Sequence, residues 1–225
     1  MSGDFVPGLA GVVAARSAIG WIDGQEGILR YRGIRIEELA AHSSFEEVCY
    51  LLLFGELPST EALAQFDGEL KALRELPAGV IEIIRNIPDG GHPMVALQTA
   101  VSALGTYYPQ MDVTDRDGNR AAGLRLIATL PSIVAAFDRL RKGQDVIAPN
   151  PELNHAANFL YMLTGEQPDE KVTRLIDVCL VLHAEHGFNA STFTGRVVGS
   201  TLANPYSVIA GAVGSLSGPL HGGAN

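Results

Sequence analysis

The sequence is poor in cysteine and in basic residues, and each shortage narrows the possible functions. Its two cysteines, Cys49 and Cys179, lie within apolar patterns of helical spacing, so we expect buried free thiols in the reducing cytoplasm rather than a disulfide framework. Lys and Arg number 16 against 25 Asp and Glu, which gives a formal net charge of −9. This charge argues against nucleic acid or an anionic membrane as a partner, although a local cluster of Arg and His still allows an anionic substrate.

Long hydrophobic runs are also missing. No apolar stretch reaches the ~18 residues that span a bilayer, and the first residues lack the basic and apolar segments of a signal peptide, so we expect no membrane association. The chain has instead a composition suited to a buried core, because 47% of its 225 residues are hydrophobic and 18% are charged. This balance excludes a disordered chain, and the length fits one large domain or two small ones.

Helical periodicity dominates after a short N-terminal hairpin. Residues 18–31 contain two apolar runs around a turn made from Asp23 and glycines, which predicts a β-hairpin. Ser44 and Glu47 form a capping box that starts a helix. We therefore predict an all-α fold with a small N-terminal β-hairpin, whose helices span residues 45–54, 63–73, 80–87, 93–105, 119–142, 154–165, 168–187, 190–203 and 205–217.

Two helical segments carry patterns that predict how they pack. In the helix over 168–187 the apolar spacing predicts a buried face made of Val172, Leu175, Ile176, Cys179 and Leu182. The last two helices are rich in small side chains, which suggests that their backbones approach closely, inside a core or across a subunit interface. These small residues are Gly195, Gly199, Ser200, Ala203, Ala210, Gly211, Gly214 and Ser215.

A polar cluster marks the end of the helix over 168–187. His183, His186, Asn189 and Ser191 follow one another at spacings of three, three and two. A helix that ends at Gly187 would place the two histidines on its last turn, one above the other. They could merely complement the helix dipole, as the serine could merely start the next helix. Two histidines at this spacing could also bind zinc, but the segment matches neither zinc-protease motif, so we predict no metal.

A single histidine stands in a glycine frame near the end of the chain. His221 follows Pro219 and precedes Gly222 and another glycine, so the backbone around it can adopt unusual dihedral angles and admit a ligand. A fixed imidazole N–H at such a place can stabilise an oxygen that gains negative charge during a reaction. A lone histidine in a protein is, however, usually structural.

These two segments together resemble citrate synthase. Family members read much like LHADHEFNAS and GPLHGGAN, and here residues 182–191 read LHAEHGFNAS and residues 218–225 read GPLHGGAN. Further segments that look like the family's bacterial members occur in the same order along the chain, over residues 27–33, 45–48, 55–58, 92–97, 157–165 and 189–193. The resemblance implies a nearly all-helical fold with a large domain, a small domain and a homodimeric or larger assembly.

The resemblance also implies roles for the polar residues. His221 matches the catalytic histidine that polarises the thioester carbonyl of acetyl-CoA, and Ser191 the serine that hydrogen-bonds its imidazole. His186 matches the histidine that binds oxaloacetate. Asn189 would support that pocket or cap the following helix, and His183 and Gly222 would be supporting neighbours. Acetyl-CoA would be a substrate, with no further cofactor.

The resemblance covers one of the family's two domains. Residues 1–225 match most of the large, dimer-forming domain, which is incomplete here, and the small domain, with the second catalytic histidine, the aspartate base and the arginines, would follow Asn225. We therefore expect these residues alone to be inactive. Two alternatives stay open: a 2-methylcitrate synthase that uses propionyl-CoA, and a non-catalytic assembly module if 225 residues are the whole protein.

Overall fold

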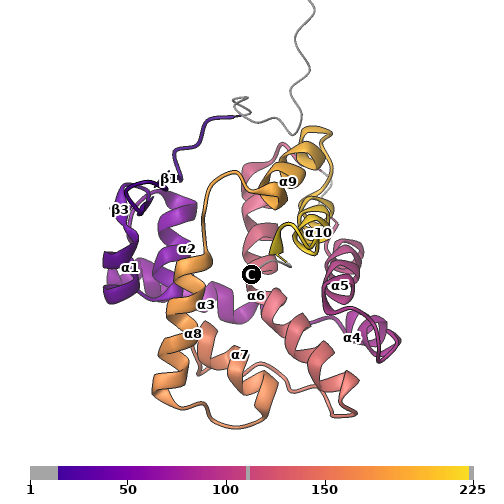
Figure 1. Ribbon diagram of the computed structural model, residues 1–225. Coiled ribbons are helices and arrows are strands. Elements are labelled where there is room, and N and C mark those ends of the chain that lie inside the picture. Colours follow the sequence, from indigo (N-terminus) through magenta and orange to yellow (C-terminus); the bar gives the residue numbers. More distant parts are fainter. Residues whose placement is uncertain (1–14, 110–111, 223–225) are drawn as a thin grey trace, which may run out of the picture.

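The computed structural model describes residues 15–109 and 112–222, which form a small sheet followed by helices (Figure 1). The antiparallel sheet contains β1 (Gly20–Asp23), β2 (Ile28–Tyr31) and β3 (Ile34–Arg35). The helices are α1 (Ile36–His42), α2 (Phe45–Phe54), α3 (Thr60–Ala72), α4 (Ala78–Arg85), α5 (Pro93–Tyr107), α6 (Arg116–Arg141), α7 (His155–Thr164), α8 (Glu170–His183), α9 (Ala190–Ser200) and α10 (Pro205–Leu216). The predicted all-α fold with a small N-terminal hairpin is confirmed.

The sheet is one strand larger than predicted. β1 pairs with β2 so that Gly20 lies opposite Tyr31, and β2 continues into β3 through a two-residue turn. Both turn residues have positive φ, 48° at Arg32 and 88° at Gly33, as a tight hairpin turn requires. An Arg-Gly pair is not a strong turn signal, which is why the sequence did not reveal the third strand.

Local capping determines most helix boundaries. In α2, Ser44 N donates to Glu47 Oε2 over 2.7 Å and Glu47 N donates to Ser44 Oγ over 3.3 Å, so the predicted capping box is confirmed. Gly55 ends this helix with φ 96°, a value that glycine adopts without steric cost. α6 begins three residues earlier than predicted, because Asp115 accepts hydrogen bonds from the first turn.

The prediction for α8 was wrong at its C-terminus and on its buried face. The helix ends at His183 instead of Gly187, so His186 lies beyond it and not one turn above His183. The hydroxyl of Tyr31 lies 3.1 Å from the carbonyl oxygen of Val181 and 3.2 Å from that of Leu182. It can donate its one hydrogen to either of these helix-end carbonyls, which further helical N–H groups would otherwise meet.

The face of α8 that packs against the neighbouring helices is also not the predicted one. Its buried positions are Asp177 and Val181. Val172 and Leu175 are instead 46% and 62% exposed, and Cys179 is only partly buried, whereas Cys49 is buried as expected. The carboxylate of Asp177 accepts from Phe45 N over 2.8 Å, so this polar residue lies on the face of α8 that meets α2.

The close approach predicted for the last two helices is confirmed within the chain. A Cβ placed on Gly195 would lie 3.5 Å from Val208 Cγ1, and one on Gly211 would lie 3.1 Å from Val198 Cγ2. Larger side chains at these positions would force α9 and α10 apart. Together with α5, the pair lies on one side of α6, with the sheet, α1 and α2 on the other (Figure 1).

α6 supplies much of the core. Its side chains form the main hydrophobic cluster with those of α4, α5 and α10. By length and composition alone this helix could cross a membrane, but 56% of its most apolar window is buried inside the protein. Its apolar character therefore has a sufficient explanation in core packing.

A buried polar cluster joins α2, α7 and the end of α3. His155 N donates to Glu46 Oε1 over 2.7 Å, and the imidazole of His155 lies 4.9 Å from the ring of Phe45. Arg74, which is 1% exposed, donates to the carbonyl oxygen of Leu153 over 2.8 Å. Burial, and then the nearby charge of Arg74, lower the pKa of His155 to about 4, while burial raises the pKa of Glu46.

We predict that neutral His155 makes the stability of the protein depend on pH. Its pKa is lower in the folded chain than in the unfolded chain, so its contribution is complete above pH ~6.5 and is lost as the pH falls toward about 4. Between about pH 7 and about pH 4.5, the free energy of unfolding of the wild type should fall by roughly 2–3 kcal/mol more than that of His155→Gln. Urea denaturation at several pH values measures this difference.

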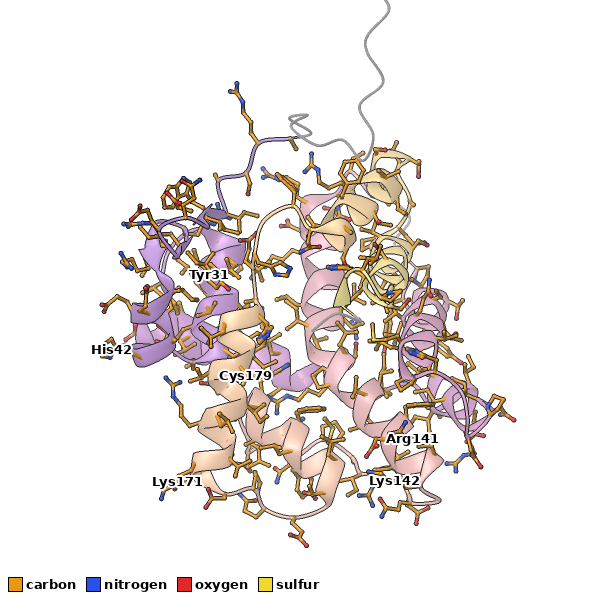
Figure 2. All side chains as sticks on the ribbon, viewed as in Figure 1. Tyr31, His42, Arg141, Lys142, Lys171 and Cys179 are labelled. Carbon is orange, nitrogen blue, oxygen red and sulfur yellow. The ribbon has the colours of Figure 1, made fainter. Side chains whose placement is uncertain are left out.

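His42→Gln provides the control, because His42 lies at the periphery of α1 and its imidazole is largely exposed (Figure 2). That variant should keep the pH dependence of the wild type. Parallel curves for the wild type and His155→Gln would contradict the prediction. Burial raises the pKa of Glu46, so its contribution to the pH dependence has the opposite sign, but Glu46 is present in all three proteins.

Candidate active site

The polar residues of the two sequence segments meet at the N-terminus of α9. Asn189 is the N-cap of this helix, and Ser191 lies in its first turn. The oxygen Oγ of Ser191 lies 2.5 Å from Nε2 of His221. The amide nitrogen Nδ2 of Asn189 lies 2.9 Å from Nε2 of His186. One helix end therefore holds both histidines.

The α9–α10 hairpin explains why His221 reaches Ser191. α9 has 11 residues and α10 has 12, and four residues connect them. Because both helices rise by about 1.5 Å per residue, the chain that leaves α10 returns to the level at which α9 began. Leu202 lies in the connection with φ 62°, a left-handed conformation that reverses the chain. The small residues between the helices keep this return close.

The hydrogen bonds of Asn189 determine which tautomer of His186 fits. Its Oδ1 accepts the backbone N–H of Thr192 over 2.9 Å, and a backbone N–H can only donate. This orients the amide so that Nδ2, a donor, faces Nε2 of His186. Nε2 must then accept, so the neutral imidazole of His186 carries its hydrogen on Nδ1. Of the two functions that the sequence left open for Asn189, the structure contains the helix cap, and it adds a contact with His186.

The contact between Ser191 and His221 allows two arrangements of hydrogens. Either the hydroxyl donates to an unprotonated Nε2, or an Nε2–H group donates to Oγ. The backbone N of His221 also donates to the carbonyl oxygen of Gly218 over 3.0 Å, which closes a turn. Gly222 has a steric reason to be glycine, because a Cβ there would overlap the carbonyl oxygen and side chain of Leu216.

His183 does not join this arrangement through any hydrogen bond described for residues 15–109 and 112–222. Its Nδ1 lies 2.6 Å from the carbonyl oxygen of Cys179, four residues earlier in α8. Because a carbonyl can only accept, Nδ1 carries the hydrogen and Nε2 is left free on an exposed side chain. A supporting role for His183 stays a prediction.

Two residues near the site were not predicted to belong to it. Glu185 Oε1 accepts the backbone N–H of Gly187 over 2.8 Å, and Glu185 N donates to the hydroxyl of Tyr31 over 3.1 Å. A weak signal was available, because Glu185 stands between the two histidines of the motif and Tyr31 lies in a segment that also resembles the family. The spacing pattern could not show that the two are in contact.

Among the residues that the structure describes, no group of three or more His, Cys, Asp or Glu side chains could hold a metal ion. The structure is thus a helical domain in which His221 is paired with Ser191, and His186 with Asn189, at the start of α9. A family model described as "Citrate synthase, C-terminal domain" matches residues 8–225. The chain belongs to the citrate synthase family.

Known proteins similar to this chain include two named synthases and one solved structure. The citrate synthase of Acidithiobacillus ferridurans is 54% identical over 227 residues, which cover 99% of this chain and 59% of that protein. The 2-methylcitrate synthase 1 of Corynebacterium glutamicum is 44% identical and is matched over 97% of this chain and 58% of its own length. The crystal structure of citrate synthase from Pyrobaculum aerophilum has a TM-score of 0.89 at 42% identity, over 96% of this chain and 56% of that one. The chain thus spans somewhat less than three fifths of the length of these proteins.

We predict that Asn189 has two separable functions. Asn189→Asp should keep the cap, because aspartate also accepts from Thr192 N, but it replaces the Nδ2 donor by an oxygen. His186 must then donate from Nε2, so its imidazole ¹⁵N shifts should move away from the Nδ1–H tautomer. Asn189→Ala should lose the contact and, in addition, about 1 kcal/mol of stability.

Histidine-labelled protein observed by NMR, together with urea denaturation, tests both parts. Asn154→Ala is a matched control, because Asn154 caps α7 in the same way and does not touch His186. It should lower the stability and leave the spectrum of His186 unchanged. Identical His186 spectra for the wild type and Asn189→Asp would refute the tautomer assignment.

Proposed function

We propose that the full-length protein is a citrate synthase, which condenses acetyl-CoA with oxaloacetate to form citrate and CoA. The observation that carries the proposal is the pair of contacts that ties His221 to Ser191 and His186 to Asn189 at one helix start. Membership of the family and 54% identity to a citrate synthase support it. The remaining catalytic groups would come from the segment that corresponds to the rest of those longer proteins.

In this proposal His221 stabilises the enol of acetyl-CoA. Of the two arrangements that the contact allows, we choose the one in which the hydroxyl of Ser191 donates to Nε2, because the hydrogen of the neutral imidazole would then be on Nδ1 and could face the thioester oxygen. When a carboxylate takes a proton from the methyl group, negative charge builds up on that oxygen, and a fixed donor in place beforehand lowers the barrier. A neutral histidine can serve as such an electrophile.

His186 would bind oxaloacetate through Nδ1–H. Asn189 occupies its Nε2, so Nδ1 remains as the donor for a keto or carboxylate oxygen. The positive end of the α9 dipole is favourable for a dianion at the same place, although the formal net charge of the chain is −9. The methyl carbon would then attack the keto carbon, the keto oxygen would take up a proton, and water would cleave the thioester to release citrate and CoA.

The assembly and the location of the enzyme are part of the same proposal. We place α5, α6, α9 and α10 at a homodimer interface, since these helices match the interface helices of the family. The enzyme would act in the cytoplasm, with acetyl-CoA and oxaloacetate as its small-molecule partners and no further cofactor.

His221→Ala should reduce kcat of the full-length enzyme by about 10²–10³-fold, because it removes one donor to the developing oxyanion. The fold should survive, since His221 is only partly buried and follows the last helix. A CoA-release assay measures the loss, and His42→Ala on the exposed face of α1 is the matched control. Near-normal turnover in His221→Ala would show that this histidine does not act on the thioester.

A 2-methylcitrate synthase is the second candidate, supported by 44% identity to the Corynebacterium glutamicum protein. The higher identity to a citrate synthase favours acetyl-CoA. Propionyl-CoA differs from acetyl-CoA by one methylene group, and a pocket that discriminates between two such substrates changes kcat/KM by about 10–200-fold. We therefore expect kcat/KM for acetyl-CoA to exceed that for propionyl-CoA by at least ~10-fold. The reverse ratio would favour the second candidate, and no turnover with either substrate would favour a non-catalytic assembly module.

A further inference from the structure

His186 lies in a short non-helical connection between α8 and α9, residues 184–189, and the backbone on both sides of it is hydrogen-bonded. The N–H group of the preceding Glu185 donates to the hydroxyl of Tyr31 over 3.1 Å. The N–H group of the following Gly187 donates to Glu185 Oε1 over 2.8 Å. Gly187 has φ 85°, so the chain reverses immediately after His186.

The hydroxyl of Tyr31 is suited to hold this connection. Tyr31 is fully buried, and its oxygen lies within 3.2 Å of two carbonyl oxygens at the end of α8 while it accepts from Glu185 N. Burial raises the pKa of Tyr31, so the phenol stays protonated and keeps its donor. One side chain from β2 thus ends α8 and anchors the residue before His186.

The carboxylate of Glu185 makes the second connection to the sheet. Its Oε2 is buried and has no hydrogen-bond partner among the described residues. This oxygen occupies the space that a Cβ on Gly20 would fill, so any larger residue at that position of β1 would displace the carboxylate. Gly20 and Tyr31 lie opposite each other in the β1–β2 ladder. The paired residues Gly20 and Tyr31 therefore contact the carboxylate and the backbone N–H group of Glu185, respectively.

We propose that Glu185 is a positioning residue, which holds His186 in its binding orientation through the Gly20–Tyr31 pair of the N-terminal sheet. Glu185 does not touch the substrate in this proposal. It acts through the backbone of His186, while Asn189 orients the imidazole itself. The inference rests on the proposed role of His186 only where oxaloacetate is concerned, because the orientation of the side chain can be observed without substrate.

Four variants separate positioning from simple stabilisation. Glu185→Ala removes the contact with Gly187 and leaves room beside Gly20. Gly20→Ala introduces a Cβ that displaces the carboxylate, and the double variant relieves this overlap without restoring the contact. Glu185→Gln keeps an oxygen for Gly187 N and serves as the conservative rescue. Gly24→Ala, in the same hairpin with nothing within 4 Å of its Cβ, is the matched control.

The first readout is the imidazole NMR spectrum of His186 in histidine-labelled protein, assigned with His186→Gln. Glu185→Ala, Gly20→Ala and the double variant should all lose the wild-type Nδ1–H signature, whereas Glu185→Gln and Gly24→Ala should retain it. The free energy of unfolding should behave differently from the spectrum. Gly20→Ala should lose stability through the overlap with Glu185, and the double variant should regain that part of it. A purely structural role would make the spectrum and the stability recover together, which would overturn the proposal.

The second readout is oxaloacetate binding to the full-length protein by calorimetry. Variants that lose the His186 signature should bind oxaloacetate about tenfold more weakly, because a misplaced donor no longer meets its acceptor. KM for acetyl-CoA should change by less than about twofold. The reason is that Glu185 acts on His186, which would bind oxaloacetate, and not on His221, which would face acetyl-CoA. An unchanged spectrum in Glu185→Ala would overturn the positioning role. A changed spectrum with unchanged oxaloacetate affinity would support positioning and contradict the proposed role of His186.

Discussion

The amide of Asn189 hydrogen-bonds with both of its ends, and the geometry of the site depends on this. The oxygen accepts from the first turn of α9, and the nitrogen then has to face His186. A helix start needs such an acceptor because its first N–H groups have no partner within the helix. The requirement of the helix therefore determines the hydrogen position on a histidine three residues away, and with it the atom that is available to a ligand.

The rest of the arrangement follows from where the neighbouring helices end. The hydroxyl of Tyr31 terminates α8 before His186, so this histidine is free of the helix and can turn toward α9. Close packing of α9 against α10, which glycine permits, returns the chain to the same end of α9 and places His221 beside Ser191. Two histidines from separate segments thus converge on one helix start.

Two groups with shifted pKa values lie away from this site. His155, with its pKa lowered to about 4, and Glu46, with its pKa raised, are buried between α2 and α7, and backbone hydrogen bonds account for their presence there. Shifted pKa values accompany functional sites, but buried structural groups produce them as well. In this protein the hydrogen-bond pattern, and not the size of a pKa shift, identifies the candidate site.

The sequence by itself determined the starts of α2, α7 and α9 and the residue types of the site, because both are local. Ser44 with Glu47, Asn154 and Asn189 each satisfy N–H groups within three residues, and the segments around His186 and His221 carry the family's pattern in adjacent letters. Only the tertiary structure decided where α8 ends, which of its faces is buried, and that Glu185 belongs to the site. These outcomes depend on Tyr31, Gly20 and Phe45, which are more than 130 residues away in the chain from the groups they meet. A periodic pattern cannot report a hydrogen bond or a steric contact at that separation, because its partner is fixed only when the sheet and the helices have packed together.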